Sequence, residues 1–153
     1  WAVEYLNNEL QIPYSYDEAG YIAIHLHSAR RGEQNNHRII REVTIVSDTM
    51  GLIAQELGID LYAEEMGLNY SRLANHLRLL LERYQKQQYA VLDEEIIEMV
   101  RVKYPESYAI AKKVRVMLIK QYQLATSSEE LGYIAIHIER LRKAAQKEEE
   151  KNS

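Results

Sequence analysis

Two histidines in this chain end identical six-residue segments. Gly20 to His25 and Gly132 to His137 both read GYIAIH, at an offset of 112 residues. Near neutral pH a histidine ring presents an unprotonated nitrogen that can attack an electrophile such as phosphorus, and this chemistry needs no metal. A metal pair is a poorer interpretation, because His25 and His27 are two residues apart and point to nearly opposite sides of a helix. The repeated histidine is therefore a candidate nucleophile, although a histidine beside an apolar helix face is often structural.

The match between the two copies extends beyond the hexapeptide. Ser15 and Glu18 align with Ser127 and Glu130 at the same offset. A serine followed three residues later by a glutamate is a capping box, which marks the start of a helix. Residues 39–113 have no upstream partner, so we expect the end of one module followed by a complete second module. Leu6 with Leu118, Gln11 with Gln123, and Arg30 with Arg142 extend the match.

Apolar residues spaced three and four apart predict helices through most of the chain. The ends of these helices are indicated by Gly58, Ser71, Asp93, Pro105 and the capping box at Ser127. Five helices joined by short loops predict an all-α bundle. The five stripes are Ile39, Val43, Val46, Met50, Ile53 and Leu57; Leu73, Leu77, Leu80 and Tyr84; Leu92, Ile96, Met99 and Val100; Ile110, Val114, Met117 and Leu118; and Leu131, Ile134, Ile138 and Leu141.

The polar segments suggest where the modules begin and end. The sequence SARRGEQNNHR is polar and contains a glycine, which is typical of a connector. The last residues are charged and offer no apolar side chain to bury, which predicts a frayed tail. We expect a truncated first module at 1–30, a linker at 31–38, a complete module at 39–146 and a disordered tail at 147–153. Because Trp1 falls inside a helix of the first module, the chain is expected to be a fragment.

Composition excludes several classes of protein. The 153 residues are enough for one domain with a proper core, and the absence of cysteine excludes disulfides and zinc-thiolate sites. No apolar run reaches the roughly 20 residues that cross a bilayer. The net charge of −4 argues against strong nucleic-acid binding by this segment itself. Paired carboxylates, a nucleophile triad and a glycine-rich phosphate loop are also lacking, so we do not expect an enzyme, a cofactor or a metal.

Three segments resemble the regulation domain of the phosphotransferase system, abbreviated PRD. DEAGYIAIHLHSA and EELGYIAIHIERLRK are similar to the second histidine motif of that family, and YSRLANHLRLLLER is similar to the first. The resemblance covers nearly all of residues 2–145 and extends to the tandem arrangement of two modules. It is strongest toward transcriptional antiterminators of the BglG, LicT and SacY type. It implies an all-α, five-helix PRD bundle preceded by the C-terminal helices of another PRD.

The resemblance also implies phosphoacceptor histidines. By position these are His76 and His137 in the complete module and His25 in the truncated one, whereas His27 and His37 inherit no role. The implied phosphoryl donors are HPr or a sugar-specific enzyme II component, acting in the cytoplasm on a homodimer. RNA would be bound by an N-terminal domain that this chain does not contain. Arginines close to the histidines in sequence are candidate phosphate neighbours: Arg72, Arg78, Arg140 and Arg142.

Two other interpretations stay open at this point. The same module also occurs in phosphotransferase-regulated transcriptional activators, where further domains follow it. The closing segment KEEEKNS resembles a natural terminus and favours the antiterminator. Alternatively, the bundle serves as an oligomerisation scaffold whose histidines are never phosphorylated. The two functional classes differ in the chemistry of the histidines.

Overall fold

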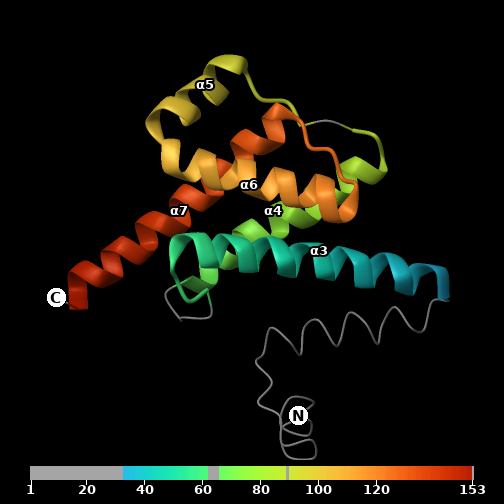
Figure 1. The fold of residues 1–153 in the computed structure, drawn as a ribbon, viewed down its shortest axis with the longest axis horizontal. Coiled ribbons are helices and arrows are strands. Elements are labelled where there is room, and N and C mark those ends of the chain that lie inside the picture. The colour runs from blue at the N-terminus through green and yellow to red at the C-terminus, as the bar shows by residue number, and fades with distance from the viewer. Residues whose placement is uncertain (1–32, 62–65, 89, 153) are drawn as a thin grey trace, which may run out of the picture. The chain divides into compact units, whose positions relative to one another are not determined.

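The computed structural model describes residues 33–61, 66–88 and 90–152, and this part of the chain contains five α-helices and no strand (Figure 1). The all-α prediction is confirmed for these residues. The expected helices of the first module, at 1–30, lie outside them. The chain divides into two units, Trp1–Thr44 and Ile45–Ser153, and the second contains both predicted histidines of the complete module. The helices are α3 (Glu33–Leu57), α4 (Gly67–Gln85), α5 (Glu94–Lys103), α6 (Pro105–Tyr122) and α7 (Ser128–Asn152).

Several helix ends follow the sequence signals. Pro105 occupies the first turn of α6, where its missing N–H costs nothing. Asp93 precedes α5, and its carbonyl accepts hydrogen bonds from Ile96 and Ile97. The outer ends of α3 and α7 extend further than the apolar stripes indicate. Helix α3 begins at Glu33, within the expected linker, and α7 continues to Asn152 through the expected tail. Neither extension contains glycine or proline, and the α7 extension is rich in alanine, lysine and glutamate, which are strong helix formers.

The core of the second unit is organised around α7. This helix packs against α4, α5 and α6, and α5 also contacts α6. Its buried residues recur at the helical period and form an apolar face, and this face allows one helix to pack against three neighbouring helices. The stripe predicted for α7 is confirmed, since Leu131, Ile134, Ile138 and Leu141 are all buried. Figure 1 shows the C-terminal turns of α7, in red, extending past α5 and α6.

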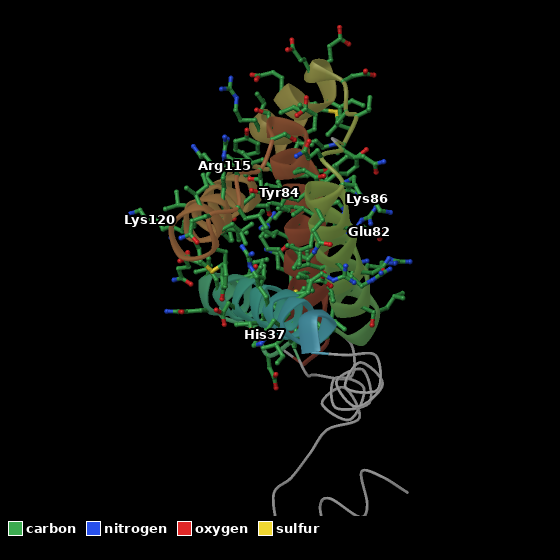
Figure 2. All side chains as sticks on the ribbon, turned by 90° about the vertical axis from the view of Figure 1, so that its right-hand side faces the viewer. His37, Glu82, Tyr84, Lys86, Arg115 and Lys120 are labelled. Carbon is green, nitrogen blue, oxygen red and sulfur yellow. The ribbon has the colours of Figure 1, made fainter. Side chains whose placement is uncertain are left out.

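Three residues predicted for the core are exposed instead. Ile96 and Met99 lie on the outer side of the short helix α5, whose inward face consists of Val100 and the half-buried Ile97. Tyr84 is exposed because the inward stripe of α4 turns through Leu81 rather than continuing to the last turn. The Tyr84 hydroxyl donates a hydrogen bond to the Gln123 carbonyl at 3.2 Å. In Figure 2 the exposed pair Glu82 and Lys86 marks the outer side of the same helix, and these two side chains form an ion pair at 2.6 Å.

Gly132, the first residue of the repeated hexapeptide, lies where α7 approaches α5 closely. A Cβ placed on it would lie 3.0 Å from Leu92 Cδ2 and 3.6 Å from Ile97 Cγ1. We expect Gly132→Ala to be nearly neutral, because about 1 kcal/mol gained in helix propensity offsets the tight contact. Gly132→Val should lower the free energy of unfolding by about 1–3 kcal/mol through overpacking. Urea titrations monitored by circular dichroism measure both.

Gly51 provides the matched control for this prediction. It also lies inside a helix, but a Cβ placed on it would meet nothing within 4 Å. Gly51→Ala should therefore raise the free energy of unfolding by about 0.5–1 kcal/mol, and Gly51→Val should not be destabilising through overpacking. Equal losses for the two valine variants would contradict the assigned role of Gly132.

Candidate functional site

Two of the histidines singled out in the sequence lie side by side where α4 contacts α7. The ring centroids of His76, on α4, and His137, on α7, are 4.9 Å apart, and the ring planes are inclined by 39°. Tyr133, one turn before His137, places its ring 5.5 Å from that of His76 and donates a hydrogen bond from its hydroxyl to the Val91 carbonyl. The fold thus joins the two histidine motifs into one site.

Both rings occupy the border between the apolar core and the surface. His76 lies between the buried residues Leu73 and Leu80, and its side chain is only 12% exposed. His137 lies between Ile134 and Leu141, which are also buried, and is itself half-buried. The apolar stripes of α4 and α7 fix the rotation of each helix, and this rotation turns the two rings toward each other.

His137 is held in its neutral form. Burial is the main cause that lowers its pKa, to about 4, and electrostatic interactions with His76, Arg140 and Arg72 act in the same direction. At neutral pH this ring therefore has a nitrogen lone pair available for bonding. A neutral imidazole is the form that acts as a nucleophile.

A buried carboxylate, Glu130, completes the site. Arg83 of α4 donates two hydrogen bonds to it, from Nε at 2.8 Å and from Nη2 at 2.9 Å. Oε2 of the same carboxylate lies 3.4 Å from Nε2 of His76. Burial by itself would raise the pKa of Glu130, but the contacts and electrostatic interactions with His76 and Arg83 outweigh it and hold the pKa below its usual value. Glu130 is thus an ionised group in the interior of the α4–α7 contact.

The sequence assigned Glu130 to a capping box, and only half of that box exists. The Glu130 N–H donates to Ser127 Oγ at 3.3 Å, as the motif predicts. The carboxylate faces Arg83 and His76 instead of the start of the helix. The same glutamate recurs as Glu18 in the first module, and this repetition could have pointed to a role in the site. The capping box, however, already explained why a glutamate occurs at this position. No sequence pattern pointed to Arg83, because the segment that contains it has no upstream copy.

The four predicted arginines fall into different surroundings. Arg72 and Arg140 are exposed and act electrostatically on His137, and neither forms an ion pair with another described residue. Arg78 is exposed and donates to Asn75 Oδ1 at 3.2 Å. Arg142 does not join the histidine pair in this way; its guanidinium is occupied elsewhere by carboxylates. Arg72 and Arg140 are therefore the two of these four arginines whose charges act on His137.

Arg142 belongs to a second polar cluster. It forms a two-bond fork with the buried Glu139, at 2.9 and 3.0 Å, and contacts Glu106 at 3.4 Å. The buried Ser107 hydroxyl also donates to Glu139, at 2.8 Å. Burial would raise the pKa of Glu139, but its hydrogen bonds with Arg142 and Ser107 and the nearby positive charges lower it below the usual value. This cluster is a satisfied link between α6 and α7.

The remaining predictions fall elsewhere in the chain. His25 and His27 lie outside the described residues, and His37 is an exposed residue of α3. Within the described ranges, no group of three or more histidine, aspartate or glutamate side chains is arranged to hold a metal ion. None of the described helices combines the length and the apolar character required to span a membrane.

The fold and the paired histidine motifs define a regulation domain, and comparison with known proteins agrees. The family model of the PRD domain matches residues 47–141, more than half of the chain, and the chain belongs to this family. It is 27% identical over 148 residues to a beta-glucoside operon antiterminator of Dickeya chrysanthemi, covering 96% of this chain and 51% of that protein. It is 25% identical over 138 residues to Protein GlcT of Staphylococcus aureus, covering 89% and 47% respectively.

The chain spans about half the length of these curated relatives. No solved structure shows a significant match.

Proposed function

We propose that this chain is the cytoplasmic regulatory part of a bacterial transcriptional antiterminator, switched by phosphorylation of His76 and His137. The observation that carries the proposal is the pairing of the two rings at 4.9 Å across the α4–α7 contact. Two histidines from separate sequence motifs meet at a half-buried border where a single added charge changes the packing. The similarity to a beta-glucoside operon antiterminator supports the proposal that the process is transcription antitermination.

The chemistry requires only a donor and an unprotonated ring. A ring nitrogen attacks the phosphorus of a phosphohistidine on HPr, or of a phosphorylated enzyme II component. The bond between phosphorus and the donor breaks, and the donor atom keeps its electron pair. The pKa of about 4 at His137 keeps this ring unprotonated at neutral pH. The chain is then a substrate of phosphoryl transfer and needs no cofactor of its own.

The added phosphoryl group would change the α4–α7 contact. It carries a charge of about −1.5 to −2 at pH 7, and it would arrive near a carboxylate that is already ionised and buried, Glu130. Repulsion from Glu130 and attraction toward the exposed Arg72 and Arg140 act together on the two helices. We propose that this biases the homodimer between two arrangements, and thereby the RNA-binding activity of an N-terminal domain. His25 would have the same role in the first module.

Phosphorylation is tested by incubating the chain with phosphorylated HPr and, separately, with phosphorylated enzyme II components, followed by mass mapping at alkaline pH, where phosphohistidine survives. We expect label on His76 and on His137. His76→Ala and His137→Ala should each abolish label at the altered position only. His37→Ala is the matched control, since His37 is exposed but lies outside the histidine pair. Absence of label with every donor would leave an oligomerisation scaffold.

The same variants test whether the histidines are needed for folding. Because both rings lie at the border of the core, we expect each alanine substitution to retain nearly all of the helical content, with at most about 1–2 kcal/mol lost in the free energy of unfolding. Circular dichroism spectra and urea titrations measure both quantities. Loss of the helical signal on either substitution would make the histidines structural.

A further inference from the structure

We propose that Glu130 is a positioning residue that directs phosphorylation of His76 to Nδ1, by holding a proton on Nε2. This inference rests on the proposed function, because it assigns the reacting atom of the same site. The juxtaposition that carries it is a buried carboxylate, fixed by an arginine, that faces one nitrogen of a nearly buried histidine.

The first step concerns the charge of Glu130. Its side chain is 8% exposed and accepts two hydrogen bonds from the guanidinium of Arg83, at 2.8 and 2.9 Å. An ionised carboxylate has no proton to donate and can only accept hydrogen bonds. A ring nitrogen that faces it must therefore carry a hydrogen to make a favourable contact.

The second step concerns Nε2 of His76. This atom is buried, lies 3.4 Å from Glu130 Oε2 and has no hydrogen bond of normal geometry among the described residues. A lone pair at this position would face the negative oxygen and be repelled, whereas an N–H would point toward it and be stabilised. In a neutral ring with the proton on Nε2, the lone pair available for attack is on Nδ1.

The third step compares the two possible products. A phosphoryl group on Nε2 would place a dianion against a buried carboxylate in a space that solvent does not reach. Attack through Nδ1 forms the new nitrogen–phosphorus bond on the other side of the ring, and the donor keeps the electron pair of the bond that breaks. The ring then retains its Nε2 proton as a phosphoimidazolium, whose positive charge is stabilised by Glu130.

The repeat provides an independent observation. Glu18 precedes His25 by the same seven residues by which Glu130 precedes His137. A capping box alone would be satisfied by glutamine as well as glutamate at this position. The acidic residue is present in both copies, which agrees with a role for its charge.

The test begins with the unaltered 153-residue chain. Long-range ¹H–¹⁵N correlation spectra, assigned by single histidine substitutions, report which nitrogen of each ring carries the proton. We expect the Nε2–H form at His76 in larger excess than at the exposed His37. Phosphorylation with potassium phosphoramidate, which releases ammonia, is then followed by ³¹P spectra that separate the two phosphohistidine isomers. We expect the Nδ1 isomer at His76 in about tenfold excess or more.

Glu130→Ala should remove both preferences, so that the tautomer ratio of His76 approaches that of His37 and the Nδ1 excess falls about tenfold. If this variant does not fold, Glu130→Gln replaces it and should reduce the excess, because an amide can donate as well as accept. Glu139→Gln is the matched control: Glu139 is an equally buried, arginine-bound carboxylate on the same helix, in the Ser107–Arg142 cluster. It should leave both ratios at His76 unchanged.

A proton on Nδ1 of His76 in the unaltered chain, or a predominant Nε2 isomer, would overturn the inference. So would folded Glu130 variants with unchanged ratios. If His76 takes no phosphoryl group from any donor, the proposed function fails at this residue. The tautomer spectra then decide the role of Glu130 by themselves, since they require no phosphorylation.

Discussion

Replacing Ile134 by alanine is expected to lower the free energy of unfolding by about 2–4 kcal/mol. Ile134 has no exposed surface and lies in the middle of the repeated hexapeptide, on the side of α7 that enters the core. The substitution removes three buried carbon atoms and leaves a cavity among well-packed neighbours, so both the transfer free energy and the packing are lost. Urea titration of the chain at neutral pH measures the loss.

Ile136 provides the control within the same six residues. It has the same side chain and the same helix propensity, but it is only half-buried and packs at the margin of the core. We expect Ile136→Ala to cost clearly less than Ile134→Ala, about 1 kcal/mol. Equal losses for the two isoleucines would show that the orientation assigned to α7 is wrong.

The stability of the bundle is expected to fall as the pH is lowered from about 6.5 to about 4, because of His137. The folded state holds the pKa of this ring at about 4, mainly through burial, whereas an unfolded chain has the usual value of about 6.5. Between these values the unfolded state binds a proton that the folded state does not bind. Protonation therefore favours unfolding in this window, with a total loss on the order of 1–3 kcal/mol.

His137→Asn separates this contribution from that of the carboxylates. Asparagine is polar and does not titrate, so the variant should show a much flatter dependence of unfolding free energy on pH between 6.5 and 5. The lowered pKa values of Glu130 and Glu139 cause a further loss only at more acidic pH, below the usual carboxyl value, and both proteins should share it. Parallel pH curves for the two proteins would mean that folding does not lower the pKa of His137.

The helices could be predicted from short stretches of sequence, because the residues that start a helix or form its apolar stripe lie close together in the chain. The stripe of α7, the proline at the start of α6 and the serine before α7 each depend on residues within one or two turns. The failures occur where a helix has more than one apolar face. In α5, Ile96 and Val100 both fit a helical stripe, and only the packing of α7 against this helix determines that Val100 is the buried one.

The site could be predicted only in part. The repeat and the family resemblance pointed to His76 and His137, but their contact is set by the packing of α4 against α7, across 61 positions of sequence. The Arg83–Glu130 pair joins residues 47 positions apart, and its arginine belongs to the segment without a second copy. Among the arginines, nearness in sequence placed Arg142 with His137, yet the helical rotation between them directs it to Glu139 and Glu106.

The length of α7 beyond the histidine pair has a mechanical consequence. From His137 to Asn152 the helix continues for 15 residues, or about 22 Å at 1.5 Å per residue. Because a helix is stiff, a tilt of about 5° at the ring pair displaces the C-terminal end of α7 by about 2 Å. A small change in packing around two imidazoles is thereby converted into a movement longer than a carbon–carbon bond at the far end of the same helix.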